Sequence, residues 1–272
     1  MASMQNIKMF SDFIKELSEK KNVIYELTQR DFKANYLGSY LGMIWAFLLP
    51  IANIFIFWFV FQIGFRSKPV QDFPYILWYI VGMIIWNFFS DSVNNGMNSV
   101  AQNAFVVKKV AFSIGILPII KILSALAIHA FFLVFVGILF VCYGYYPDLY
   151  WLQVFYYLLA TLVLVTGLSW LTASVVIFFR DLRQIIAILL QFGFFLTPIF
   201  WSVTILPPKY QAVIKFNPIF YLVNGYRDSF IHKVWFWENM ASALFFWSFT
   251  IATFILGALV FRRLRPHFAD VI

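Results

Sequence analysis

The chain has 272 residues, of which 62% are hydrophobic and only 12% are charged, and its formal net charge is +8. In an ordinary soluble domain about a quarter of the residues are charged, so this composition excludes a soluble globular protein. Uncharged runs of about 18 residues or more are long enough to cross a bilayer as helices. The sequence therefore predicts an all-α polytopic membrane protein with six transmembrane helices. The uncharged runs are 34–65, 73–90, 122–147, 149–179, 184–208 and 239–261.

The basic residues follow the predicted topology and do not form a patch for nucleic acid. If six spans leave both ends of the chain in the cytoplasm, 13 of the 20 Lys and Arg residues fall on the cytoplasmic side and 6 on the outer side. This excess obeys the positive-inside rule. We therefore expect cytoplasmic N and C termini, membrane lipids as partners through their anionic headgroups, and no nucleic-acid partner.

Residues 1–40 are predicted to form amphipathic helices in the cytoplasmic interface of the membrane. Within 5–20, apolar residues recur at spacings of three and four, which is typical of one apolar helix face. The segment is too polar to cross the bilayer and is expected to lie along it. Gly38, Ser39 and Gly42 then permit a sharp turn into the first span.

A six-span bundle is expected over 41–261 and a cytoplasmic tail over 262–272, so the whole chain, 1–272, is predicted to be a single transmembrane domain. Between the fifth and sixth spans, segment 202–239 is moderately apolar, aromatic and interrupted by three prolines. We expect short re-entrant helices there, with an ordinary outer loop as the alternative. The expected spans are about 41–64, 74–93, 114–141, 150–179, 184–201 and 240–261.

No residue pattern in the sequence predicts an active site. The twelve acidic residues lie away from the middle of the predicted spans, where ion-coupled carriers usually place carboxylates. The sequence has one cysteine, no G-x-x-x-x-G-K-[ST] phosphate loop, and no catalytic or metal-binding cluster. We therefore expect no enzyme activity, metal or bound cofactor in this chain, and a partner on the cytoplasmic side as its energy source. Lys121 is expected to extend to the inner interface, and His129 to be a hydrogen-bonded interior residue.

Aromatic residues are the strongest positive signal, because Phe, Trp and Tyr make up 22% of the chain. In the first span, Phe55, Trp58 and Phe59 share one helix face at spacings of three and four, and the fifth span has Phe192 and Phe195. Aromatic faces can stack on the apolar faces of sugar rings, so such rings would guide a polysaccharide along a channel. Contact with lipid and helix packing are an equally good interpretation.

Several motifs, in chain order, resemble a known family. The stretch LTQRDFKANYLGSYLGMIWAFLLP (27–50) is similar to the N-terminal segment of ABC transporter permease subunits that export O-antigen, capsule and teichoic acid polymers. NAFVVKKVAFSIGILP resembles the segment between spans two and three of those permeases. FFRDLRQI and FFLTPIFWS resemble their span-four end and span five, and NPIFYLVNGYRDSF their outer re-entrant segment. The N-terminal motif is carried by Leu27, Arg30, Asp31, Lys33, Tyr36, Ser39, Leu41, Gly42, Trp45 and Pro50.

The resemblance implies a bacterial inner-membrane exporter with two copies of this chain and two ATPase subunits, which bind ATP and magnesium. A lipid-linked polysaccharide would pass between the two copies. The residues that would recognise its pyrophosphate at the cytoplasmic interface are Arg30, Asp31, Lys33 and Tyr36. The residues of the re-entrant segment are Pro198, Asn217, Pro218 and Arg227. The residues that would couple to the ATPase are Asn103, Phe105, Val106, Lys108, Lys109, Phe112, Arg180 and Asp181.

Two other classes of protein stay open at this point. An integral membrane enzyme acting on lipid-linked sugars would explain the aromatic residues and interfacial helices, but it needs an acid or base that the sequence does not offer. A non-catalytic membrane scaffold would explain the composition alone.

Overall fold

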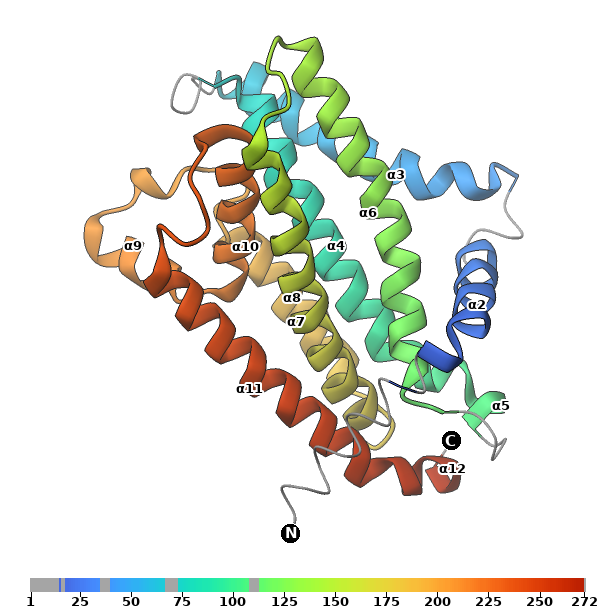
Figure 1. Cartoon of the computed structure of the whole chain (residues 1–272). Coiled ribbons are helices and arrows are strands. Elements are labelled where there is room, and N and C mark those ends of the chain that lie inside the picture. Colours follow the sequence, from blue (N-terminus) through green and yellow to red (C-terminus); the bar gives the residue numbers. More distant parts are fainter. Residues whose placement is uncertain (1–14, 16–17, 35–39, 67–72, 108–112, 272) are drawn as a thin grey trace.

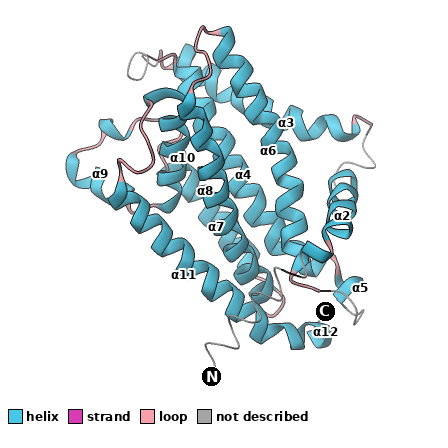
Figure 2. Cartoon of the chain, in the orientation of Figure 1, coloured by secondary structure: helices cyan, strands magenta, loops and turns pink. Residues whose placement is uncertain are grey.

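The computed structural model describes residues 15, 18–34, 40–66, 73–107 and 113–271. The secondary-structure elements formed by these residues are helices (Figure 2), which confirms the predicted all-α fold. The α-helices are α2 (Lys21–Ala34), α3 (Trp45–Trp58), α4 (Tyr75–Gln102), α5 (Ala104–Val107), α6 (Ile116–Cys142), α7 (Gln153–Val176), α8 (Leu182–Leu196), α9 (Pro208–Lys215), α10 (Pro218–Arg227), α11 (Met240–Leu264) and α12 (Phe268–Val271). Short 3₁₀ or π-helical turns are Gly42–Ile44, Phe59–Gly64, Leu149–Leu152, Val203–Ile205, Asp228–His232 and Arg265–His267.

Five helical stretches of the described chain are long and apolar enough to cross a bilayer. The expected fifth span corresponds to α8, which is apolar but has only 15 residues. At 1.5 Å per residue α8 is about 22 Å long, shorter than a hydrocarbon core of about 30 Å. A sixth crossing through α8 therefore stays a prediction. The five long stretches are Gly42–Gly64, Tyr75–Gln102, Ile116–Cys142, Leu149–Val176 and Met240–Val271.

Helix α4 lies at the centre of the bundle (Figure 1), and 78% of its most apolar window is buried. It packs against α6, α7 and α10, and α7 also packs along α11. The contact between α7 and α11 is close because two glycines meet: a Cβ on Gly257 would collide with the carbonyl oxygen of Gly167. Small residues allow helix backbones to approach each other within a membrane.

Helix α4 is longer than the predicted second span. The expected end was near residue 93, but the helix continues through the polar sequence NNGMNS to Gln102. The Asn98 Nδ2 donates to the carbonyl oxygen of Asn94 (2.9 Å), so a polar side chain bonds to its own helix and does not interrupt it. The extension means that α4 continues for more than two turns beyond Asp91.

A second apolar cluster joins the two ends of the chain at one end of the bundle. Its buried residues come from α2, α4, α6, α7, α11 and α12 and include Ile24, Trp170, Phe261 and Phe268. Figure 1 shows α2, α5 and α12 at this lower end. The first described helix, the segment after α4 and the last helix are therefore held close together.

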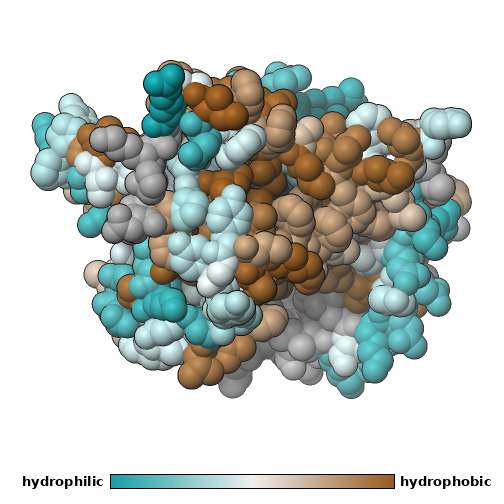
Figure 3. All heavy atoms as spheres, turned by 90° about the horizontal axis from the view of Figure 1, so that it is seen from above, coloured by the Kyte–Doolittle hydropathy of each residue, from teal (hydrophilic) through white to brown (hydrophobic). Residues whose placement is uncertain are grey.

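Helix α3 crosses the bundle at a wide angle to α4 and α6 (Figure 1). Gly42, with a φ of +52°, forms part of the turn before it as predicted, whereas Gly38 and Ser39 lie outside the described residues. Only 11% of the most apolar window of this span is buried. Seen from above, hydrophobic side chains cover a broad area toward the side of α3 and α6 (Figure 3). Such a surface predicts contact with lipid or with another protein.

Segment 202–239 folds into short helices. Helix α9 begins at Pro208 and α10 at Pro218, positions where a missing backbone N–H costs nothing. Helix α10 is largely buried and packs against α4, α7 and α11. The entrance of α9 and α10 into the bilayer stays a prediction.

Candidate functional site

The four residues predicted for the re-entrant segment meet at the turn that ends α8. Asn217 caps α10 by accepting a hydrogen bond from a backbone N–H of that helix (3.0 Å), and its Nδ2 donates to the Thr197 hydroxyl (2.8 Å). Pro218 is the first residue of α10. At the other end of the helix, Arg227 donates to the carbonyl oxygen of Pro198 (2.7 Å). Both ends of α10 are thus bonded to the segment that follows α8.

Arg227 is a buried cation, 2% exposed, whose hydrogen-bond partners are backbone carbonyls. It donates to Pro198 (2.7 Å), Ile199 (2.8 Å) and Trp78 (3.4 Å). Its guanidinium carbon also lies 3.4 Å from the ring centroid of Trp78. The planar guanidinium can donate to several carbonyl oxygens at once. Arg227 therefore holds the non-helical turn that follows α8.

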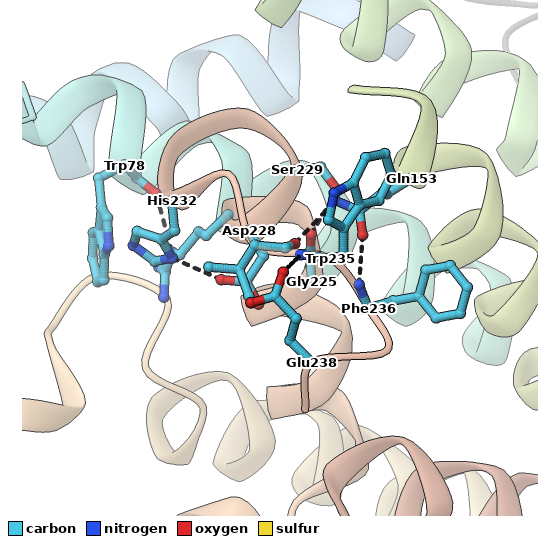
Figure 4. Close-up of polar contacts among 11 residues, drawn as sticks. Trp78, Gln153, Gly225, Asp228, Ser229, His232, Trp235, Phe236 and Glu238 are labelled. Atoms are coloured by element: carbon cyan, nitrogen blue, oxygen red, sulfur yellow. Dashed lines mark hydrogen bonds and ion pairs between the residues drawn. The ribbon is translucent and has the colours of Figure 1, made fainter. Parts of the chain in front are cut away.

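The loop between α10 and α11 is fastened to the start of α7 (Figure 4). The Gln153 Oε1 accepts a hydrogen bond from the backbone N–H of Phe236 (2.7 Å), and its Nε2 donates to the carbonyl oxygen of Val234 (3.0 Å). Asp228 and His232 lie 2.8 Å apart through Oδ1 and Nδ1. This aromatic loop is therefore a fixed part of the upper end of the bundle.

Asp31, predicted among the pyrophosphate-recognition residues, points toward α6. Its Oδ1 lies 2.6 Å from Lys121 Nζ, and its Oδ2 accepts a hydrogen bond from the Ser124 hydroxyl (2.9 Å). Lys121 is only 7% exposed. Lys121 is therefore paired with a carboxylate of α2, and its extension to the inner interface stays a prediction. Asp31 positions α2 against α6.

The other residues of that predicted set lie elsewhere on α2 or beyond it. Arg30 and Lys33 are exposed, so their side chains are accessible to a ligand at the lower end of the bundle. Tyr36 lies outside the described residues. The structure therefore separates a positioning residue, Asp31, from two exposed cations.

The predicted ATPase-coupling residues belong to two connections at the lower end of the bundle. Asn103 ends α4, and Phe105, 72% exposed, follows in α5, which also contains Val106. Arg180 and Asp181 are exposed in the turn between α7 and α8. Outside the described residues lie Lys108, Lys109 and Phe112.

Helix α12 lies between these two connections, a contact that sequence reasoning missed. The ring of Phe268 is fully buried, 6.3 Å from that of Phe178 and 5.4 Å from that of Phe261. Helix α12 also contacts α5. The signal was an aromatic residue directly after the basic stretch RRLRPH, in a segment expected to be only a tail.

The predicted channel aromatics lie on outward faces of α3 and α8. The exposed fractions are 59% for Phe55, 50% for Phe59, 63% for Phe192 and 53% for Phe195, and Trp58 is half-buried. These ring faces are open to lipid, to another copy of the chain or to a ligand.

A different set of aromatic rings joins α3 to α8. The ring centroid of Phe57 lies 5.6 Å from that of Phe194 and 5.9 Å from that of Phe200, and Phe61 lies 5.3 Å from Phe200. Phe57 and Phe61 are four residues apart on one helix face, which was the signal in the sequence. Periodicity shows a face but not its partner, so this contact could not be predicted.

Polar side chains inside the bundle are bonded to one another. The His129 Nε2 lies 2.9 Å from the Tyr226 hydroxyl, which confirms the predicted hydrogen-bonded interior histidine. The Trp247 Nε1 donates to the Tyr156 hydroxyl (2.8 Å), which lies 3.1 Å from that of Tyr221. Among the described residues, no three His, Cys, Asp or Glu side chains lie close enough together to hold a metal ion.

Long apolar helices around a buried central helix define a polytopic helical membrane protein. The chain belongs to the ABC-2 type transporter family, whose sequence profile matches residues 22–231. It is 28% identical over 253 residues to an O-antigen export system permease protein RfbA of Klebsiella pneumoniae, covering 92% of this chain and 95% of that protein. The RfbA protein of Myxococcus xanthus is 27% identical over 80% of this chain and 83% of its own length. The polysialic acid transport protein KpsM of Escherichia coli is 22% identical over 89% of this chain and 93% of its own length.

Proposed function

We propose that this chain is the membrane permease of an ATP-driven exporter that moves a lipid-linked, O-antigen-like polysaccharide from the cytoplasmic side across the bacterial inner membrane. The observation that carries this proposal is the near-complete match to a permease named for O-antigen export, over 92% of this chain and 95% of that protein. A match of this extent covers the whole bundle and not one shared segment.

The ATPase partner docks on the lower end of the bundle, with two ATPase subunits for two copies of this chain. Phe105, Arg180 and Asp181 are exposed there, and α12 lies between their two connections. A displacement of α5 would therefore reach both the end of α4 and the last helix. ATP and magnesium bind to the partner, and this chain supplies the surface that receives the motion. The lower end, with α2 and α12, then faces the cytoplasm.

The substrate is recognised at the same end. Arg30 and Lys33 are exposed on α2, and cations of this kind suit a pyrophosphate group. Asp31 holds α2 against α6 through Lys121, which fixes the height of both cations in the cytoplasmic interface. The polysaccharide then passes between two copies of the chain, past the outward faces of α3 and α8, while α9 and α10 re-enter the bilayer at the outer side.

Deleting the gene and analysing the surface glycans tests this proposal. We expect loss of one surface polysaccharide and accumulation of its lipid-linked form inside the cell, with recovery when the intact gene is returned. Purification of the chain from the native membrane is expected to bring an ATPase subunit with it. Unchanged surface glycans together with purification of the chain alone would contradict the proposal.

A further inference from the structure

A polar groove lies between α4 and α8. Its volume is about 350 Å³, within the range of pockets that hold small ligands. The residues from α4 are four apart, and those from α8 lie at positions 187, 190, 191 and 194, so each helix contributes one face. The lining includes Trp86, Ser90 and Asn94 of α4 and Leu190, Gln191 and Phe194 of α8.

The amide side chains of this groove have no partner in the described part of the chain. Asn94 and Gln191 are exposed, and of the hydrogen bonds among described residues, the one that reaches Asn94 uses its backbone oxygen and not its side chain. Amide groups that face hydrocarbon are costly. This face must therefore meet water, a second protein or a polar ligand.

The chemistry of the lining favours a sugar as the ligand. The ring centroids of Trp86 and Phe194 lie 5.8 Å apart at one end of the groove. Gly193 allows that approach, because a Cβ there would lie 2.9 Å from the Trp86 ring. Rings cover the apolar face of a sugar, while amides and a hydroxyl bond to its hydroxyl groups. The lining side chains in the described chain are all neutral, so a moving polymer would not be held by a fixed charge.

We propose that the groove between α4 and α8 is a sugar-binding subsite of the transport path. Asn94, Gln191 and Ser90 bind sugar hydroxyls, and the half-buried Phe194 contacts the apolar ring face, with Trp86, 5% exposed, packed behind it. The proposal rests on the proposed export of a polysaccharide and names where its sugar units are held. The occupant is the polymer, because the lining combines aromatic rings with two amides and a hydroxyl and has no charged side chain among the described residues.

Export by substituted chains tests this subsite. The double variant Asn94→Leu/Gln191→Leu is expected to lower the rate of polysaccharide export by about tenfold, the factor that one or two lost hydrogen bonds produce. Asn94→Gln, which keeps the amide, is expected to retain more export than Asn94→Leu. Ser248→Leu on the exposed face of α11 is the matched control and is expected to change nothing. Protein level, ATPase co-purification and self-association are measured for each. Unchanged export, or loss of self-association in the double variant, would overturn the subsite.

Chemical labelling gives a second readout that does not depend on rate. In a chain with Cys142→Ser, which removes the exposed native thiol, Asn94→Cys is expected to react with a water-soluble maleimide. A polysaccharide stalled by a hydrolysis-deficient ATPase is expected to block that reaction. No reaction, reaction without protection, or a disulfide between two copies at position 94 would each overturn the subsite. If the wild-type chain restores no surface polysaccharide, the proposed function has failed; if it does and these variants behave like it, only the subsite has failed.

Discussion

Lys121 and Asp31 are two largely buried charges that join α6 to α2, with side-chain exposures of 8% and 15%. Charges removed from water are stable only when each finds an opposite charge and hydrogen bonds. The Ser124 hydroxyl supplies one of these to Asp31. Because the partners are 90 positions apart in the sequence, this contact decides where the N-terminal helix lies, and with it the height of Arg30 and Lys33.

Breaking this pair on one side should be more harmful than removing both charges. We expect Asp31→Asn to destabilise the docked α2 by about 3 kcal/mol, because it leaves Lys121 buried without a carboxylate. The double variant Asp31→Leu/Lys121→Met should recover much of the loss, because two apolar side chains replace the charged pair. Thermal unfolding of the purified protein and protease cleavage within α2 measure both effects. Identical unfolding of the single variant and the wild type would show that the pair does not hold α2.

Helix α5 is short, and its position between α4 and α6 is the basis of its proposed coupling role. It has four residues, follows α4 directly after Asn103, and contacts α12. A helix of this length depends on its neighbours for stability, so small changes within it are expected to affect coupling before they affect the bundle.

Proline at Phe105 tests that role. A proline disfavours the helical conformation of the residue before it, here Ala104, so Phe105→Pro should disorder this four-residue helix and remove the exposed ring. We expect polysaccharide export to stop while the ATPase still binds and hydrolyses ATP, and charge reversal at Lys108 and Lys109 to act in the same direction. Lys215→Glu, at an exposed position of α9 away from these connections, is the control for charge reversal. Normal export by Phe105→Pro at equal protein level would remove the coupling assignment.

The outward aromatic faces of α3 and α8 provide a test of the channel. Replacing Phe55, Trp58 and Phe59 by Leu keeps apolar area but removes ring stacking of about 1 kcal/mol per ring. We expect slower export, and the same for Phe192→Leu/Phe195→Leu. Export, protein level and ATPase rate are compared with a lipid-facing control.

The control for this test has to be an exposed ring on another helix. Phe155 on α7 is 69% exposed and suits the purpose, whereas Phe132 of α6 is buried (4%). Phe155→Leu is expected to leave export unchanged. If all three sets export at the same rate, the aromatic residues serve membrane packing, and the ring-lined channel has to be abandoned even if the transporter assignment stands.

At the scale of the whole molecule, the sequence predicts the features that depend on local pattern, such as the membrane spans. It does not predict the contacts between distant segments. Five of the six predicted spans correspond to long apolar helices, because hydrocarbon requires uncharged runs whatever the fold. The end of α4 was missed because Asn98 bonds to its own helix. The four residues predicted for the re-entrant segment lie near one another in the structure, but the bonds from Arg227 to the turn after α8 depend on packing that no periodicity encodes.

The orientation of the chain in the membrane is predicted by the distribution of its charged residues. The packing of the helices does not test it. The structure places α2, α5, the turn at 180–183 and α12 at one end of the bundle. If the positive-inside rule holds, all of them are cytoplasmic. The proposed ATPase contact requires this, because ATP is hydrolysed in the cytoplasm.

Single cysteines in a Cys142→Ser chain decide the orientation of the whole molecule. We expect Leu149→Cys and Lys209→Cys to react with a membrane-impermeant maleimide added to intact cells, since both side chains are exposed at the upper end. Asp181→Cys and Arg263→Cys, exposed at the lower end, should react only after the membrane is permeabilised. The labelling after permeabilisation is the control for reactivity of each thiol. A reversed pattern would place the coupling segment and the exposed cations of α2 on the outer side, away from any ATPase. Reaction of Leu149→Cys and Arg263→Cys from outside, with Asp181→Cys and Lys209→Cys protected, would instead mean that α8 does not complete its crossing, because only the positions after this 15-residue helix would change sides.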